Sequence, residues 1–266
     1  MRLPADYHTH TPLCRHARGQ PTELAAQAVR IGLDEMGFSD HNPMPQDDFD
    51  NWHMRAADLD TYIEQVEQAR RDHPGLTIKL ALEVDYLPGH ENWIRELARR
   101  YPWDYLIGSV HYVSKDWAID NPEQISEWRR RDPIEVWTTY CDHLVRAAQS
   151  GLFDIIGHAD LCKKFCFYPK GDRAELFNDF VRAAKASGVA VELNTAGLRK
   201  DCREIYPSAG ILQLAARQGV PITFGSDAHA PEEVGMNLSE AVQLARAAGY
   251  KHCLRFTKRQ PERVSL

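Results

Sequence analysis

Short apolar segments alternate with amphipathic, helix-like segments along the whole 266-residue chain. In one helix-like segment, for example, Leu59, Ile63 and Val66 recur at helical spacing. Helix-like segments are followed by a glycine, the residue favoured at a left-handed helix end, at Gly32, Gly151, Gly188, Gly219 and Gly249. The expected strands cover residues 6–8, 35–39, 78–84, 105–110, 154–157, 189–194 and 221–225. Repeated strand–helix units of this kind predict an α/β fold with a parallel sheet, here a TIM-like barrel of seven strands.

The chain shows no internal boundary. No linker or shift in composition divides it, so we expect a single domain over residues 1–266. The apolar segment 251–255 is a candidate for one further strand outside the barrel.

The composition is that of an ordinary globular protein, with 43% hydrophobic and 26% charged residues. A net charge of −6 argues against a nucleic-acid-binding surface, which would be basic. The start of the chain lacks the apolar core of a signal peptide, and no stretch is apolar enough to span a bilayer. Six cysteines without a paired framework indicate reduced thiols. We therefore expect a cytoplasmic protein without nucleic-acid or membrane partners, and the sequence leaves its oligomeric state open.

Histidines and acidic residues follow the expected strands rather than preceding them. In pairs such as His8/His10 and Asp227/His229, the two side chains point to the same side of an extended segment. The carboxyl ends of barrel strands converge on one face, where such folds place their chemistry. Imidazole and carboxylate ligands without paired thiolates favour Zn, Mn or Fe. The pattern therefore predicts a hydrolase with several metal ions, whose candidate ligands are His8, His10, His16, His41, Glu83, His111, His158, Asp227 and His229.

Several of these segments carry recognisable motifs. They are 7–10 with His16, 37–43, 82–86, 108–112, 157–158, 192–200 and 225–229. Together and in this order, they resemble the PHP (polymerase and histidinol phosphatase) superfamily. The stretch 192–200, continuing into 204–207, is similar to its histidinol-phosphate phosphatase branch. The resemblance implies a distorted (β/α)7 barrel that holds three divalent metal ions.

The resemblance also implies how the ligands are shared. His8, His10, Glu83 and Asp227 would hold one metal. Glu83 would bridge to a second metal held with His111 and His158, and the third metal would be bound by His16, His41 and His229. The family further implies a cationic phosphate clamp, for which the candidates are Arg199 and Lys163. Lysine is the weaker candidate because it cannot make a planar bidentate contact.

The expected reaction is hydrolysis of L-histidinol phosphate to L-histidinol and phosphate, in histidine biosynthesis. A metal-bound hydroxide would attack phosphorus, and Glu83, Asp227 and His229 count as catalytic residues because they would hold the reacting metals. Asp160 is a candidate proton donor to the leaving alcohol. By their spacing, Asp85 and Asp160 are also candidates for contacting the substrate's amine or imidazole. Two alternatives stay open: a phosphodiesterase or exonuclease of the same superfamily acting on nucleotides, and a non-catalytic metal store.

Other polar residues receive more ordinary interpretations. Asp40 is expected to orient a histidine ligand by accepting its second N–H. The run 129–131 is interpreted as a solvated helix face. Cys253 and Arg259 match the spacing of cysteine-dependent phosphatases, but the intervening loop has no glycine to cradle a phosphate. We expect no ligand role for His53, His73, His90, His143 and His252.

Overall fold

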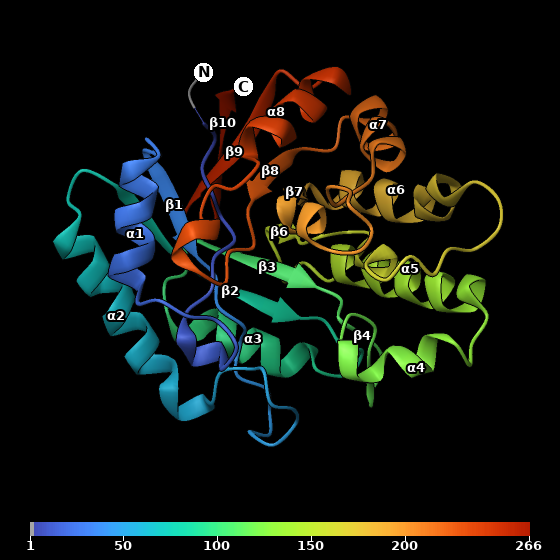
Figure 1. The fold of residues 1–266 in the computed structure, drawn as a ribbon, viewed down its shortest axis with the longest axis horizontal. Coiled ribbons are helices and arrows are strands. Elements are labelled where there is room, and N and C mark those ends of the chain that lie inside the picture. The colour runs from blue at the N-terminus through green and yellow to red at the C-terminus, as the bar shows by residue number, and fades with distance from the viewer. Residues whose placement is uncertain (1–2) are drawn as a thin grey trace.

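The computed structural model describes residues 3–266, and its centre is a curled parallel sheet. Within these residues the sheet has six strands in the order β1-β2-β3-β6-β7-β8 (Figure 1). This confirms the predicted α/β class and parallel pairing. The bounds are β1 (Glu35–Phe38), β2 (Thr77–Asp85), β3 (Tyr105–Ser109), β6 (Ile155–Ile156), β7 (Ala190–Asn194) and β8 (Ile222–Gly225).

The first expected strand, residues 6–8, joins the two edges of this sheet. Asp6 and Thr9 form isolated parallel bridges, with Met36 beside β1 and with Ala228 after β8. The Tyr7 amide also donates to the Phe224 carbonyl at 3.0 Å. Residues 6–8 therefore supply the seventh segment that the predicted barrel needs. Their bridges to both edges of the sheet are too sparse to make a regular strand.

Amphipathic helices cover the outside of the sheet (Figure 1). They are α1 (Pro21–Arg30), α2 (Leu59–Asp72), α3 (Glu91–Arg100), α5 (Pro133–Gln149), α6 (Asn178–Ser187), α7 (Ala209–Gln218) and α8 (Leu238–Ala247). The four-residue helix α4 (Ile125–Trp128) lies in the connection that leads to α5. In α2, Leu59 and Val66 are buried against the core, as their spacing predicts. Gly188 and Gly219 end α6 and α7 with positive φ values of 75° and 71°, the backbone state expected of them.

Short elements lie in the connecting loops. The 3₁₀ turns are η1 (Pro12–Cys14), η2 (Ala56–Asp58), η3 (Pro122–Gln124), η4 (Leu161–Lys163), η5 (Arg173–Phe177), η6 (Thr195–Arg199) and η7 (Pro231–Glu233). The two strands β4 (Tyr112–Ser114) and β5 (Trp117–Ala118) form a small antiparallel pair after β3.

An antiparallel hairpin, β9 (His252–Thr257) with β10 (Gln260–Ser265), closes the end of the barrel where the strands begin. The predicted extra strand is thus confirmed, while β10 was not predicted. Phe256 of β9 enters the barrel and joins a buried cluster with Tyr7, Tyr105 and Ile107. This apolar layer fills the barrel interior at the end where the strands begin. A polar site inside the barrel is therefore confined to the opposite end, where the strands finish.

Two expectations concern the start of the chain and membranes. Met1 and Arg2, part of the segment in which we expect no signal peptide and the start of the predicted domain, lie outside the described residues. Across residues 3–266, none of the helices combines the length and apolar character that a bilayer span requires.

Candidate metal centre

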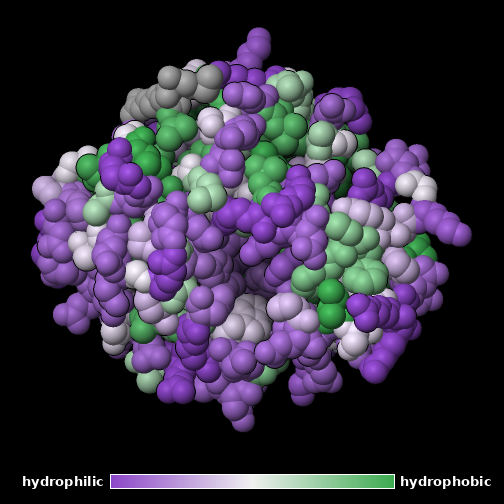
Figure 2. All heavy atoms as spheres, viewed as in Figure 1, coloured by the Kyte–Doolittle hydropathy of each residue, from purple (hydrophilic) through white to green (hydrophobic). Residues whose placement is uncertain are grey.

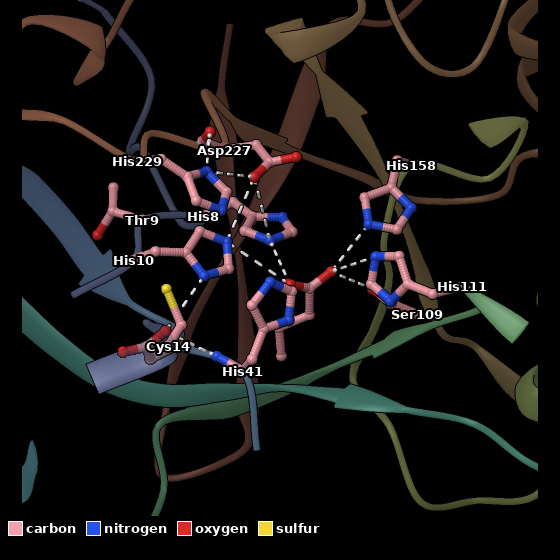
Figure 3. Close-up of polar contacts among 12 residues, drawn as sticks. His8, Thr9, His10, Cys14, His41, Ser109, His111, His158, Asp227 and His229 are labelled. Atoms are coloured by element: carbon pink, nitrogen blue, oxygen red, sulfur yellow. Dashed lines mark hydrogen bonds and ion pairs between the residues drawn. The ribbon is translucent and has the colours of Figure 1, made fainter. Parts of the chain in front are cut away.

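The labelled histidines that follow the strands converge on one place (Figure 3), and the distances below put the carboxylate of Glu83 at its centre. Glu83, near the end of β2, is only 1% exposed. Its Oε2 lies 3.1 Å from His8 Nε2, 3.5 Å from His10 Nε2 and 3.0 Å from His41 Nδ1. These imidazoles come from the segment that closes the barrel and from the loop after β1.

The other oxygen of Glu83 faces a second group. Oε1 lies 2.8 Å from His158 Nε2 and 3.7 Å from His111 Nε2, and it accepts a hydrogen bond from Ser109 Oγ at 2.6 Å. The two oxygens of one side chain thus face two separate sets of imidazoles, the arrangement of a carboxylate that bridges two cations.

A third group forms beside the first. Asp227 Oδ1 lies 3.3 Å from His10 Nε2, and Asp227 has a positive φ of 54° after β8. This strained backbone state, which aspartate tolerates better than most residues, directs the next residues back toward the site. His229 Nε2 lies 2.9 Å from His16 Nε2, and His16 Nδ1 is held by the Cys14 carbonyl at 2.9 Å.

The structure therefore brings together all nine predicted ligand residues. Within the described chain, three of the sets whose ligand atoms lie within 4.8 Å of one another are His8/His10/Asp227, His8/Glu83/His158 and His10/His41/His229.

The donor chemistry of this cluster fits divalent metals. Among residues 3–266, three buried ring nitrogens that face Glu83 lack a well-formed hydrogen bond: His8 Nε2, His10 Nε2 and His41 Nδ1. A buried polar atom without a partner costs about 1–3 kcal/mol. Cations at the centre would satisfy the nitrogens and the carboxylates together, and these donors suit Zn, Mn or Fe.

The pKa values show how strongly the groups interact. Burial alone would raise the pKa of Glu83, but the imidazoles of His8 and His41 hold it well below its usual range. Burial would lower the pKa of His8, but nearby carboxylates raise it well above its usual value. In contrast, burial and neighbouring His10 hold the pKa of His229 well below the ordinary value. Carboxylates stay ionised here, so the site attracts positive charge.

Carboxylates behind the cluster orient its histidines. Asp40 Oδ1 lies 3.3 Å from His10 Nδ1, which agrees with the orienting role predicted for Asp40. Glu192 Oε1 lies 2.7 Å from His8 Nδ1, a contact that the sequence pattern did not single out. In each pair, the carboxylate accepts one ring N–H and leaves the other ring nitrogen free to bind a metal.

Close packing at the end of β8 protects one of these pairs. A Cβ on Gly225 would lie 2.1 Å from Glu192 Oε1 and 2.6 Å from His8 Cβ. Only glycine therefore fits where this backbone passes the orienting pair.

Asp85 does not have the position expected from its spacing. It is 2% exposed and its Oδ1 lies 3.0 Å from His111 Nδ1. Its side chain therefore lies behind a predicted ligand rather than at the rim, because β2 continues to Asp85 and turns that residue inward. The suggested contact with a substrate amine or imidazole therefore has no support in this geometry, since Asp85 is not among the residues that line the cavity.

A polar cavity of about 470 Å³ opens beside the cluster. Figure 2 shows the molecule hollowed near the middle of one face, among mainly hydrophilic residues. The cavity is lined by Glu83, His111, His158, Asp227 and His229, together with Trp52, Asp120, Lys164, Arg199 and Tyr206.

Arg199 is the predicted phosphate clamp that reaches this cavity. It lies in η6, directly after β7, and its Nη2 donates to the carbonyls of Ser226 and Asp227 at 2.9 and 3.1 Å. Its buried Nη1 has no partner within residues 3–266. A guanidinium with a free donor at a polar cavity is suited to an anionic ligand.

Asp160 and Lys163 lie elsewhere. Lys163 Nζ lies 3.0 Å from Asp160 Oδ2 and donates to the Ile205 carbonyl at 2.8 Å. Both side chains are buried, and neither is among the residues that line the cavity. Their expected contacts with substrate therefore have no support in this geometry. Lys164, which directly follows η4, lines the cavity instead, because one step along the backbone turns the side chain to the other side.

His53, for which no ligand role is expected, is buried at 3% exposure and has two carboxylate partners. Its Nδ1 lies 2.6 Å from Asp50 Oδ2 and its Nε2 lies 2.8 Å from Asp85 Oδ2. Sequence spacing could not reveal this contact, because 32 residues separate His53 from Asp85.

Burial raises the pKa of the Cys253 thiol to about 11, which argues further against a cysteine-dependent phosphatase.

Comparisons with known proteins agree with this site. The PHP domain family matches residues 6–196, and a PHP-associated region matches residues 211–237. A Deinococcus radiodurans protein named as a probable histidinol-phosphatase is 40% identical over 264 residues, covering 96% of this chain and 98% of its own length. The Bacillus subtilis histidinol-phosphatase is 28% identical, over 86% of this chain and 95% of its own.

A solved structure confirms the fold. The Lactococcus lactis histidinol phosphate phosphatase, crystallised with zinc, L-histidinol and phosphate, superposes with a TM-score of 0.84 at 21% identity. The match covers 98% of this chain and all of that one. The extent of these matches and the 40% identity show that the chain belongs to the PHP domain family, in its histidinol-phosphatase branch.

Proposed function

We propose that this protein hydrolyses L-histidinol phosphate to L-histidinol and inorganic phosphate in histidine biosynthesis. The observation that carries this proposal is the site around Glu83, whose two oxygens face separate imidazole groups beside a cavity with a free arginine donor. The full-length similarity to histidinol-phosphatases supports the choice of substrate. We treat residues 1–266 as one catalytic domain, and a cytoplasmic location remains a prediction.

We propose three metal positions from the sets predicted above. His8, His10, Glu83 and Asp227 would hold the first, and Glu83, His111 and His158 the second. His16, His41 and His229 would hold the third. The 2.9 Å contact between His16 and His229 supports this last set. The Nδ1 of His41 lies 3.0 Å from Glu83 Oε2. Divalent ions bound there would neutralise a phosphate dianion and supply a nucleophile from water at neutral pH.

The side chains around the cavity have separate roles. Arg199 offers Nη1 to a phosphate oxygen, whereas Lys164 on the same cavity is paired with Asp120 at 3.0 Å. We count Glu83, Asp227 and His229 as catalytic residues because they would hold the reacting ions. The buried pair of Asp160 and Lys163 would support the wall of the cavity through Ile205 and Ser208.

Two alternatives differ in their products. A nucleotide phosphodiesterase or exonuclease would cleave phosphodiesters or DNA, although the net charge of −6 does not favour a nucleic-acid surface. A metal store would bind ions without turnover. Phosphate release should therefore be measured with histidinol phosphate, nucleoside monophosphates, a phosphodiester and single-stranded DNA. Turnover of histidinol phosphate at least about 100-fold above the other substrates is expected, and equal or absent turnover would exclude the proposal.

Replacing Arg199 by alanine tests the phosphate clamp. Loss of a charge-assisted hydrogen bond costs about 1.5–3 kcal/mol, so KM for histidinol phosphate should rise roughly 10- to 100-fold. Metal content should stay at the wild-type level, because the bonds of Arg199 within residues 3–266 go to the carbonyls of Ser226 and Asp227 and to Glu233, and to none of the nine ligand side chains. Arg203→Ala is the matched control, since Arg203 is exposed and is not among the cavity-lining residues. An unchanged KM in Arg199→Ala would remove the clamp assignment.

A further inference from the structure

A chain of buried hydrogen bonds runs from the predicted second metal position toward the surface. His111 Nδ1 lies 3.0 Å from Asp85 Oδ1, and Asp85 Oδ2 lies 2.8 Å from His53 Nε2. His53 Nδ1 continues the chain to Asp50 Oδ2 at 2.6 Å, and Tyr112 Oη donates to the same oxygen at 2.7 Å. Each member of the chain therefore bonds the next, and the predicted metal ligand is at the inner end.

This chain determines which way His111 can bind. In the neutral ring that would bind a metal, donation of the Nδ1 hydrogen of His111 to Asp85 leaves Nε2 without a proton, and Nε2 faces Glu83 Oε1 at 3.7 Å. His53 Nε2 contacts the other carboxylate oxygen of Asp85, Oδ2, so both oxygens of Asp85 have partners. Asp85 therefore cannot rotate away from His111 without breaking two bonds in a buried site.

The same residues hold a wall of the cavity. The amides of Trp52 and His53 both donate to Asp50 Oδ1 at 3.0 Å, which closes a tight turn. Trp52 stacks on His53 with ring centroids 4.0 Å apart, and it meets His111 edge-on at 5.1 Å. Because Trp52 lines the cavity, the turn that carries it is tied to His111 through His53.

A second element packs on this turn. Arg15 Nε donates to the His53 carbonyl and its Nη2 to the Asp50 carbonyl, both at 3.0 Å. Arg15 directly precedes the predicted ligand His16. The turn at residues 50–53 is therefore braced from two sides of the metal cluster.

We propose that His53 is a positioning residue that fixes His111 for the second metal through Asp85 and couples binding of that metal to the order of the Trp52 turn. This inference rests on the proposed metal positions, not on the identity of the substrate. It assigns His53 a role in metal affinity and none in contacting phosphate.

The test is metal binding by wild-type protein and His53→Gln. Metal-free proteins would be titrated with Zn²⁺ against a chromophoric chelator, and bound ions would be counted. One ion should bind about 10- to 100-fold more weakly in the variant, as is typical when an orienting partner is lost, while the others are unchanged. His73→Gln is the matched control, because His73 contacts Thr22 outside this network.

A second readout separates positioning from general stability. Zn²⁺ should slow hydrogen exchange at the amides of residues 52–53 in the wild type and have a smaller effect in His53→Gln. If this variant does not fold, Asp50→Asn at the outer end of the chain should give the same weakened site with a smaller change. Equal affinity at every site in the variants, or equal weakening of all sites with a lower melting temperature of the metal-free protein, would overturn the inference. If the wild type binds no metal, the proposed function itself fails.

Discussion

At the end of the barrel where the strands begin, acidic side chains have protein partners. Glu35 pairs with Arg255 at 3.2 Å, and Asp154 with Arg259 at 2.8 Å. At the opposite end, Glu83 is surrounded by imidazoles, and several of their ring nitrogens have no hydrogen-bond partner among residues 3–266. The hairpin end pairs its carboxylates with arginines of the chain, whereas the metal end leaves ring nitrogens around a carboxylate for cations that the chain does not supply.

This difference separates stability from function within one barrel. The hairpin end combines ion pairs with the apolar layer of Tyr7, Tyr105 and Phe256, so it should hold the fold without any ligand. The metal end contains the strained Asp227 and the unpartnered nitrogens, which cost stability until cations bind. Changes at the two ends should therefore affect different measurements.

The largest effect should come from replacing the central glutamate. Glu83→Gln removes the charge that would be shared by two metals, so the protein should lose bound metal, and kcat/KM should fall by about 10³-fold or more. Glu35→Gln makes the same chemical change at the hairpin end. It should cost roughly 1.5–3 kcal/mol of unfolding free energy, because a hydrogen bond to a charged group is weakened, while metal content stays at the wild-type level.

These two variants can break the comparison directly. Metal analysis and urea unfolding should be done on both proteins in parallel. Wild-type turnover in Glu83→Gln would contradict the bridging role, and metal loss in Glu35→Gln would show that the two ends are not independent.

Phe256→Ala tests the apolar end with an intermediate effect. Truncating this buried ring should destabilise the protein by about 3–5 kcal/mol, because a cavity is left in the barrel interior. Calorimetric or chemical unfolding would measure the loss, and the number of bound metals should not change. Leu254→Ala, at a partly buried position of the same strand, should cost clearly less. A loss of metal in Phe256→Ala at temperatures where the variant remains folded would show that the apolar layer around Phe256 also shapes the metal site.

The smallest effect concerns an ion pair at the metal end whose two side chains already neutralise each other. Asp120 Oδ2 lies 3.0 Å from Lys164 Nζ. Burial alone would raise the pKa of Asp120, but Lys164 and nearby imidazoles lower it to about 2. Because the pKa in the folded protein is below the usual 3.8, this pair adds stability above about pH 4, and the contribution disappears as the pH falls through 2.

Asp120→Asn should therefore reduce the unfolding free energy of the metal-free protein by about 1–2 kcal/mol at pH 7. The difference in unfolding free energy between variant and wild type, the stability gap, should narrow between pH 4 and pH 2. Urea unfolding at several pH values would measure it. Asp116→Asn at a neighbouring exposed position should show no gap. A gap that is independent of pH would mean that the Asp120 charge does not stabilise the fold.

The sequence predicted well those parts of the fold that depend on local pattern. The alternation of apolar and amphipathic segments placed the strands of the sheet, and Gly188 and Gly219 marked two helix ends. It did not predict β10, since Gln260–Ser265 is mostly exposed and polar and gains its pairing only from β9. A strand whose stability comes from its partner has little signal of its own.

The predicted ligands were found together because their residue types and their places after strands restrict them strongly. The substrate contacts were predicted less well. Lys163 and Lys164 are adjacent and chemically alike, and only the direction of a short turn brings one of them to the cavity. His53 and Glu192 could not be assigned for another reason: their partners Asp85 and His8 are distant in the chain.

The sequence by itself determined the fold class, the order of the elements and the chemical type of the site, because these depend on periodicity and on residue identity. The tertiary structure decided which atoms face one another: the two sides of Glu83, the buried pair of Lys163 with Asp160, and the link from His53 to His111. The physical reason is that contacts between distant segments depend on how the barrel closes and how side chains pack, and the spacing of residues along a chain does not carry that information.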